Sequence, residues 1–245
     1  MAAVATSTGL YIYGVVRSEE LPAIAAEGVA GRPVELLERG PLAALVTRLP
    51  PGELRVKRKD LHRHLRVLEE VFEEATIVPC SFGTVLASED DIEAELLAGR
   101  QDDLLAALDA LDGRVQLNVK AVYDEDDLLR EIVRSNPEVA RLRAQAAGYA
   151  EQVRLGEIVA GFVIERRDAD VARLISELSR LADDVAVDDP AGEYVALKAS
   201  FLVARENVKR FDAQLEQVAR REHPVIRLEV IGPLPPTAFA EAVAR

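Results

Sequence analysis

The residues best suited to nucleophilic, acid–base or metal chemistry are few and poorly spaced for it. The histidines are His62, His64 and His223. The first two stand two positions apart on a predicted helix, so their side chains point to different faces and are badly placed to share a metal ion. The single cysteine, Cys80, lies in an apolar stretch with no neighbouring histidine base, where cysteine usually acts as a small hydrophobic side chain. We therefore predict no catalytic residue and no metal site among them.

Two runs of carboxylates could supply acid–base pairs or calcium ligands. They are Glu89-Asp90-Asp91 and Asp124-Glu125-Asp126-Asp127. Each stands where a helix is predicted to begin, and the helix dipole stabilises acidic side chains there. Neither run has the spacing of an EF-hand loop, and the sequence contains no Walker loop, G-x-G-x-x-G or H-E-x-x-H motif. We therefore expect no enzyme and no bound cofactor.

The composition is that of an ordinary globular protein with an excess of acid. The 245 residues are 49% hydrophobic and 30% charged, which is enough chain for two domains without disulfides or metals. A net charge of −13 and an aromatic content of 4% disfavour nucleic-acid binding, for which only Arg55–Arg66 offers a basic patch. No apolar run reaches the roughly 20 residues that span a bilayer, and the N-terminus lacks a basic signal-peptide start. We expect a cytoplasmic protein with no membrane span.

The element around which the rest is organised is the apolar stretch Thr76–Leu86. Its β-branched residues, one proline and one glycine predict a buried strand with a break in it. Ser88 is a candidate N-cap for a helix that follows, and Asp112-Gly113 ends a second helix. Strands are predicted at Leu10–Val16, where Gly14 indicates a bulge or a close neighbouring backbone, at Pro41–Thr47 and at Arg114–Ala121.

The segment Lys57–Ala75 is predicted to be a helix whose charges oppose its dipole. Leu61, Leu65, Leu68 and Phe72 define its inward face. Basic residues, among them Lys57 and Arg58, crowd the start and glutamates the end, at a cost of about 0.3–1 kcal/mol for each charge at low salt. Either the basic end meets an acidic surface of a partner or of this chain, or the face is solvated and balanced by pairs such as Arg66–Glu70.

The second half repeats a strand–helix–strand pattern after a helical segment. The predicted elements are helices over 124–181, a strand at Tyr194–Val203, a helix at Arg205–Arg221, a strand at Val225–Ile231 and a stiff, extended exit at Gly232–Pro236. The predicted fold class is α+β, with two ferredoxin-like or modified ferredoxin-like units joined by a helical segment and a C-terminal Pro-rich tail. We expect an N-terminal α+β domain over 1–123. A helical linker, a C-terminal α+β domain and the tail then occupy 124–245.

Four stretches together resemble the GvpF/GvpL family of gas vesicle proteins. They are Tyr11–Val16, His64 with Thr76–Val85, Gly113–Lys120 leading to Tyr123-Asp124-Glu125, and Tyr194–Val203 leading to Gly232–Pro236. Two departures stand out. Ser81 replaces a common arginine before Phe-Gly-Thr, and Thr237-Ala238-Phe239 replaces a common Tyr-Ser-Phe.

The resemblance implies a non-enzymatic accessory or minor structural protein of gas vesicles, the hollow protein shells that give buoyancy. Its partners would be the small hydrophobic shell protein (GvpA-like) and other accessory proteins. We expect recognition near Phe82, Gly83 and Thr84, at the basic pair Lys57 and Arg58, and at the prolines Pro235 and Pro236. The alternatives are a small-molecule-sensing α+β regulatory module with a ligand cleft, and an enzyme whose polar residues converge from distant positions.

Overall fold

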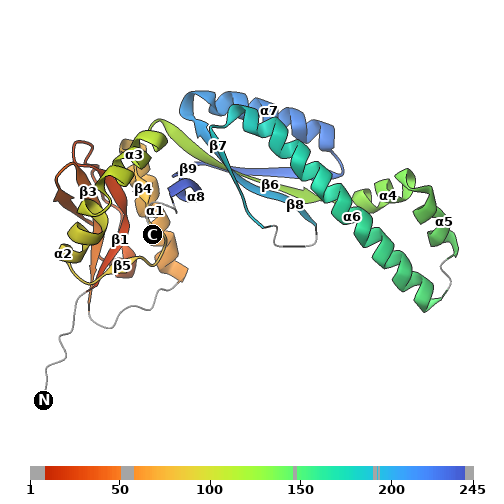
Figure 1. Ribbon diagram of the computed structural model, residues 1–245, viewed down its shortest axis with the longest axis horizontal. Coiled ribbons are helices and arrows are strands. Elements are labelled where there is room, and N and C mark those ends of the chain that lie inside the picture. The colour runs from red at the N-terminus through yellow and green to blue at the C-terminus, as the bar shows by residue number, and fades with distance from the viewer. Residues whose placement is uncertain (1–8, 51–57, 146–147, 190–191, 193, 241–245) are drawn as a thin grey trace, which may run out of the picture. The chain divides into compact units, whose positions relative to one another are not determined.

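The computed structural model describes residues 9–50, 58–145, 148–189, 192 and 194–240 (Figure 1). The chain forms two compact units: unit 1 is Met1–Gln116 with Pro233–Arg245, and unit 2 is Leu117–Gly232. The chain therefore passes between the units twice. These units differ from the domains predicted over 1–123 and 124–245, because the division falls inside a strand and the C-terminal residues join unit 1.

Unit 1 contains an antiparallel sheet of five strands in the order β2-β3-β1-β4, with β5 also paired to β1. The strands are β1 (Gly9–Arg17), β2 (Glu35–Arg39), β3 (Leu42–Leu49), β4 (Val78–Pro79) and β5 (Val85–Leu86). Helix α1 (Arg58–Glu74) connects β3 to β4. A ferredoxin-like unit has a second helix between its first two strands, and here that connection contains only the 3₁₀ turn η1 (Val29–Gly31). Unit 1 is thus a modified ferredoxin-like unit.

The predicted broken strand is confirmed. Both β4 and β5 pair with β1, and the residues between them, Cys80–Thr84, leave the ladder as a loop. Two backbone hydrogen bonds tie this loop to β1, from Cys80 N to Tyr13 O at 2.8 Å and from Ile12 N to Thr84 O at 3.0 Å. These two hydrogen bonds therefore fix both ends of the loop against β1.

Gly14 is the predicted bulge in β1. The pairing register with β3 shifts between Ile12 and Gly14. A Cβ atom at Gly14 would lie 2.7 Å from Val78 O, a distance that no real side chain tolerates. The position requires glycine because the neighbouring strand approaches too closely for any other residue.

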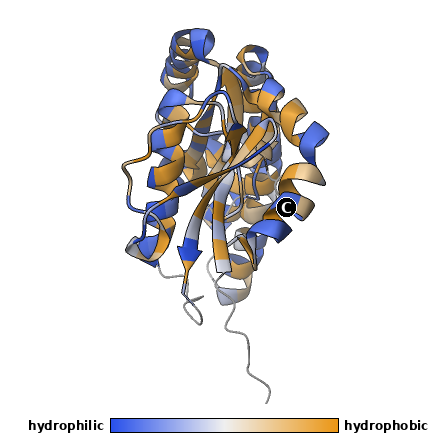
Figure 2. Cartoon of the chain, turned by 90° about the vertical axis from the view of Figure 1, so that its left-hand side faces the viewer, coloured by the Kyte–Doolittle hydropathy of each residue, from blue (hydrophilic) through white to orange (hydrophobic). Residues whose placement is uncertain are grey.

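The predicted start and stop after the loop are also confirmed. Ser88 caps α2 (Glu89–Asp91) by accepting a hydrogen bond from Asp91 N at 3.1 Å. The π-helical turn η2 (Ile92–Ala98) and α3 (Gln101–Leu111) follow. Gly113, with φ of +66°, then reverses the chain into β6 (Arg114–Tyr123), because glycine adopts this conformation at no steric cost. In Figure 2 hydrophobic and hydrophilic residues alternate along the helices.

The predicted inward face of α1 is wrong at two of its four positions. Leu68 and Phe72 are buried, but Leu61 is 37% exposed and Leu65 is 40% exposed. The inward positions are taken instead by Asp60 and His64, together with Val67 and Val71. Hydrophobic periodicity misses this arrangement because it does not credit polar side chains that find partners in the core.

Unit 2 has the β-α-β-β-α-β order of a ferredoxin-like fold, and its four-stranded sheet runs β7-β8-β6-β9. Its further elements are α4 (Glu125–Ser135), α5 (Pro137–Gln145), α6 (Tyr149–Leu178), η3 (Ser179–Leu181), β7 (Asp184–Val187), β8 (Val195–Ala204), η4 (Arg205–Asn207), α7 (Val208–Glu222) and β9 (Ile226–Leu234). Helices α6 and α7 lie over the sheet (Figure 1). Phe201 of β8 and Phe211 of α7 meet in the core, with ring centroids 5.3 Å apart.

The end of the described chain differs from the predicted tail. Pro233 continues β9, which is an edge strand and can therefore accept a residue without a backbone N–H. Pro235 and Pro236 are buried, and the short helix α8 (Thr237–Ala240) follows them. Ala238 N donates to Gln116 Oε1 at 2.9 Å. In the described part of the chain, the proline-rich segment thus packs into unit 1 instead of forming an extended exit.

Candidate functional site

The Cys80–Thr84 loop is fixed by hydrogen bonds to a tyrosine and, through the tyrosine, to a histidine. Gly83 N donates to Tyr11 Oη at 3.1 Å, and Tyr11 Oη lies 2.9 Å from His64 Nδ1. We assign the tyrosine proton to His64 Nδ1, which places the imidazole proton on Nε2. Burial lowers the pKa of His64 to about 4, so the ring is neutral at pH 7. The loop position therefore depends on a neutral hydrogen-bond relay that ends inside α1.

Aromatic packing fixes Phe82 on the same foundation. Its ring centroid lies 5.5 Å from that of His64 and 6.3 Å from that of Tyr11, in edge-on geometry. Tyr13 stacks on the other side of the cluster, 5.5 Å from His64. Gly83 has φ of +98°, a backbone conformation that suits glycine and strains other residues. Phe82 is nevertheless 37% exposed, so the loop presents an apolar ring from a rigid base.

A second relay holds the connection between β1 and β2. Val29 N donates to Tyr13 Oη at 2.7 Å, Tyr13 Oη lies 2.9 Å from Thr47 Oγ1, and Thr47 Oγ1 donates to Pro33 O at 3.0 Å. The Thr47 hydroxyl donates its proton to the Pro33 carbonyl, so the Tyr13 hydroxyl must donate to Thr47 Oγ1. Each hydroxyl is satisfied as donor and acceptor, as buried polar groups require.

The unusual charge order of α1 has an internal explanation at its acidic end. Glu70 accepts hydrogen bonds from Ala25 N at 2.6 Å and Ala26 N at 2.8 Å, and Glu74 accepts one from Ala23 N at 3.1 Å. These glutamates satisfy the backbone of the loop after β1, so another part of this chain compensates for their position. Glu70 therefore binds the backbone of that loop. It does not form the pair with Arg66 that one of the two explanations of the charge order of α1 proposed.

The basic end of α1 has no such compensation. Arg58, Lys59 and Arg66 are exposed, and no carboxylate in the described part of the chain pairs with them. Arg63, by contrast, pairs with Glu27 at 2.9 Å and with Asp60 at 3.2 Å. Lys57 lies outside the described residues. The cations left over on α1 are thus available to a binding partner.

Exposed apolar side chains stand beside these cations. Leu61 and Leu65 flank His64 along α1, on the opposite side of the helix from Arg63, and Phe82 packs on the same His64. We name this region the α1–Phe82 surface and define it by Arg58, Leu61, Leu65 and Phe82, because Arg66 follows His64 by two positions and points to a different face of α1. It combines apolar and cationic groups on a protein whose net charge is −13.

The predicted recognition residues separate into two groups. Phe82 and Gly83 are exposed, Thr84 is half-buried with its hydroxyl donating to Ser81 O at 2.7 Å, and Arg58 is exposed at the start of α1. The second group, Pro235 and Pro236, is buried inside unit 1. Leu61 and Leu65 were missed as surface residues because their spacing matched a core stripe. The signal that could have found them is Tyr11 on β1, whose buried hydroxyl takes a polar partner from the facing helix.

The chemistry of the remaining reactive groups is limited. Cys80 is 3% exposed, and burial raises the pKa of its thiol to about 12, so it is a poor nucleophile near neutrality. Over the ranges that the structure describes, no group of histidine, cysteine and acidic residues could hold a metal ion. Within the same ranges, no helix is both long and apolar enough to span a bilayer.

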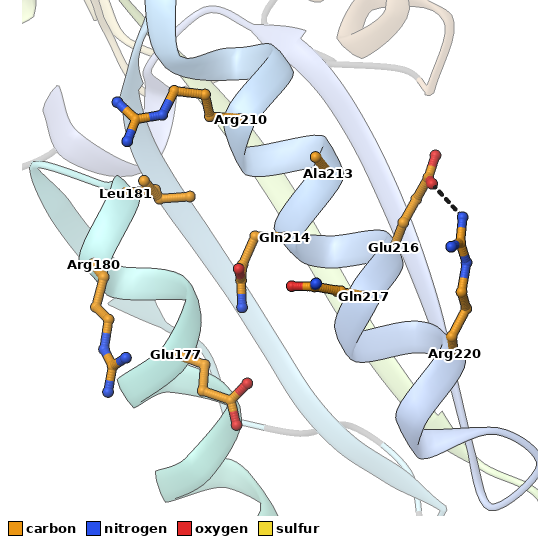
Figure 3. A pocket seen from close by; sticks show the side chains of 9 residues that line it. All are labelled: Glu177, Arg180, Leu181, Arg210, Ala213, Gln214, Glu216, Gln217 and Arg220. Carbon is orange, nitrogen blue, oxygen red and sulfur yellow. Dashed lines mark hydrogen bonds and ion pairs between the residues drawn. The ribbon is translucent and has the colours of Figure 1, made fainter.

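A polar groove of about 600 Å³ lies in unit 2 between the end of α6, η3 and α7 (Figure 3). Its lining residues are Glu177, Arg180, Leu181, Arg210, Ala213, Gln214, Glu216, Gln217 and Arg220. Glu216 pairs with Arg220 at 2.9 Å across one turn of α7. The lining includes neither histidine nor cysteine, so it is suited to ion pairing and hydrogen bonding and not to proton transfer or nucleophilic attack near neutrality.

Fold and surface together define a class of protein: two antiparallel ferredoxin-like sheets with their helices, which present an apolar and cationic surface and no assembled set of catalytic groups among the described residues. The comparisons with known proteins give the family. Residues 9–241 match the family model described as "Gas vesicle synthesis protein GvpL/GvpF". The chain belongs to this family.

Similar proteins agree along nearly the whole chain. The chain is 36% identical to "Gas vesicle protein F" of Streptomyces sp. (strain CB03234), over 94% of this chain and 99% of the relative. "Gas vesicle protein L" of the same organism is 29% identical, over 94% and 92%. The crystal structure of gas vesicle protein GvpF from Anabaena sp. PCC7120 matches with a TM-score of 0.82 at 24% identity, over 96% and 99%. That of Microcystis aeruginosa gives 0.74 at 21%, over 95% and 99%. The predicted resemblance and α+β fold class are confirmed.

Proposed function

We propose that this chain is a non-enzymatic accessory protein of gas vesicles that binds the small hydrophobic shell protein during vesicle assembly. The observation that supports the proposal is the α1–Phe82 surface, where three exposed apolar side chains stand next to cations that lack a carboxylate partner in the described chain. Its place of work would be the cytoplasm, at the growing vesicle. Other accessory proteins of the vesicle are further partners that the family suggests.

The physical role follows from the contrast between this surface and the rest of the protein. Apolar side chains that are exposed and grouped mark interaction sites in soluble proteins. A partner rich in apolar residues would gain about 25 cal/mol for each Å² of apolar surface that it buries there. The net charge of −13 would meanwhile repel other copies of the complex and keep an aggregation-prone subunit dispersed.

The test is co-purification from cells that express the tagged full chain with the shell protein. A double variant, Leu61→Glu with Leu65→Glu, places two carboxylates on the α1–Phe82 surface without touching the buried relay. Ile164→Glu is the matched control, because Ile164 is an exposed apolar residue on a helix of unit 2. We expect the wild type and the control to capture the shell protein, and the double variant to lose at least tenfold.

Two results would contradict the proposal in different ways. If the folded double variant captures as much shell protein as the wild type, binding occurs elsewhere. If the wild type captures none while both proteins remain in solution, the shell protein is not the partner. Charge reversal at Arg58 should produce a smaller loss that shrinks as salt is added, because exposed charges are screened.

A further inference from the structure

The first half of α6 carries apolar side chains that no core covers. The buried residues of this 30-residue helix are Asp170, Leu174 and Leu178, all in its second half. Tyr149 and Val153 are exposed, and Leu155 and Val159 are half-buried. A helix that packs only against its own domain shows one apolar stripe and a polar remainder. The first half of α6 departs from that pattern, which indicates a contact outside the described chain.

The same half of α6 forms one wall of a groove in unit 2. Helices α4, α5 and α6 enclose about 460 Å³, which we name the α4–α6 groove. Its lining residues are Asp126, Leu129, Arg130, Val133, Val139, Arg143, Gln152, Leu155, Gly156 and Val159. Half of them are leucine or valine, and the charged ones belong to α4 and α5.

Gly156 leaves the wall open at its centre. A Cβ atom built there would meet nothing within 4 Å. Glycine inside a helix lowers its stability compared with alanine, and no internal contact requires a glycine at this position. A wall without a side chain lets the backbone of a ligand approach α6 closely.

Charge at the rim is unbalanced. Arg130 pairs with Asp127 and, at 3.9 Å, with Asp126. Arg143 is exposed, and no carboxylate of the described chain pairs with it. An apolar groove with one unpaired cation on its rim is complementary to a segment that combines an apolar stripe with a carboxylate.

We propose that the α4–α6 groove binds an amphipathic helix of a protein partner, with its apolar stripe in the groove and an acidic side chain on Arg143. A helix fits because it satisfies its own backbone hydrogen bonds, whereas an extended peptide would bury N–H and C=O groups against leucine and valine. A fourth helix would also complete a bundle with α4, α5 and α6. The inference rests on the proposed function only in that the partner is sought among gas vesicle proteins.

The test uses a photo-crosslinking amino acid in place of Gln152, in the tagged full chain expressed together with the gas vesicle proteins of its source. Gly156→Leu fills the groove and improves helix propensity, so the variant should fold with an unchanged or higher melting temperature. Gly161→Leu is the matched control, because the Cβ at Gly161 also meets nothing within 4 Å and the residue does not line the groove. Crosslinked peptides are identified by mass spectrometry.

We expect a crosslink to one segment of a gas vesicle protein, with apolar residues at helical spacing and a flanking Asp or Glu. Gly156→Leu should reduce it at least tenfold, Arg143→Glu should reduce it severalfold, and Gly161→Leu should leave it unchanged. The proposal is overturned by no crosslink, by a crosslink to a second copy of this chain, or by a crosslink that Gly156→Leu does not affect. Capture of the shell protein is scored in the same samples, so loss of the crosslink alone is distinguished from failure of the proposed function.

Discussion

The two units bury polar side chains beneath their sheets in different ways. In unit 1 the hydroxyls of Tyr11 and Tyr13 end on neutral acceptors, His64 and Thr47. In unit 2 the hydroxyl of Tyr123 ends on a carboxylate, because it donates to Asp170 Oδ2 at 2.8 Å. Tyr11 with His64 and Tyr123 with Asp170 each join a strand to a helix, whereas Tyr13 with Thr47 joins β1 to β3. The units differ in whether the tyrosine hydroxyl ends on a neutral group or on a carboxylate, and that difference determines how each arrangement should respond to mutation and pH.

The carboxylate of Asp170 is the centre of an ionic network. It is buried, and it accepts from Arg166 Nε at 2.8 Å and from Arg173 Nη2 at 2.7 Å in addition to Tyr123. Arg166 continues to Glu131 on α4 at 2.9 Å, and Arg173 continues to Glu222 at the end of α7 at 2.6 Å. Burial would lower the pKa of Arg166, but its hydrogen bonds to Glu131 and Asp170 raise it overall. One carboxylate thus connects three helices and a strand of unit 2.

The comparison indicates that the neutral relay fixes the positions of single groups in unit 1. The ionic network instead holds helices and a strand of unit 2 together. A neutral relay costs little to bury and fixes single atoms, here Gly83 N and the ring of Phe82. A buried carboxylate is costly unless every lone pair is used, so it fixes all the elements that supply its partners. The predictions below test this contrast, beginning with the largest effect.

Asp170→Asn should destabilise unit 2 by about 3 kcal/mol, because it leaves Arg166 and Arg173 without the central charge between them. Urea denaturation of the full chain measures the change. Glu216→Gln is the control, since it removes an exposed pair with Arg220 that contributes about 0.2–1 kcal/mol. Equal effects of the two substitutions would show that the Asp170 network has no special role.

His64 should make unit 1 sensitive to acid. Its pKa is about 4 in the folded protein and about 6.5 in an unfolded chain. The unfolded state therefore binds the extra proton first, and stability present above pH 6.5 is lost as the pH falls toward 4. The loss should reach about 2 kcal/mol at pH 5. Denaturation at pH 7.5 and pH 5, compared with His64→Gln, isolates this contribution, and identical pH slopes in both proteins would refute it.

Matched tyrosine substitutions should separate the two designs. Tyr11→Phe removes the hydrogen-bond partner of both Gly83 N and His64 Nδ1, and should cost about 1–3 kcal/mol. Tyr123→Phe leaves Asp170 with both arginines, and should cost about 1 kcal/mol. Thermal unfolding of both variants ranks them. A larger loss for Tyr123→Phe would reverse the comparison.

Gly83→Ala should have a small effect on stability, about 1 kcal/mol, because it places a side chain at φ of +98°. A Cβ there meets nothing within 4 Å, so the cost is backbone strain alone. If the Phe82 ring is held by the relay, capture of the shell protein should fall more than stability does. Proportional losses of capture and stability would mean that Gly83 acts only through folding.

The sequence by itself determined the local features of this protein. The broken strand, the bulge at Gly14, the cap at Ser88 and the turn at Gly113 follow from backbone rules that involve a few neighbouring residues. The α+β class also follows, because alternation and helical spacing persist over whole elements.

The tertiary structure decided which polar residues belong inside. Asp60, His64 and Asp170 are buried because tyrosines, arginines and backbone groups from distant segments satisfy them, and no local pattern reveals those partners. Burial of His64 in turn moved Leu61 and Leu65 to the surface, where a core stripe had been predicted. The same reasoning explains the prolines. Their rigidity predicts an extended exit, but packing against unit 1 buried Pro235 and Pro236 and brought α8 to Gln116, since contacts formed by folding outweigh a local preference.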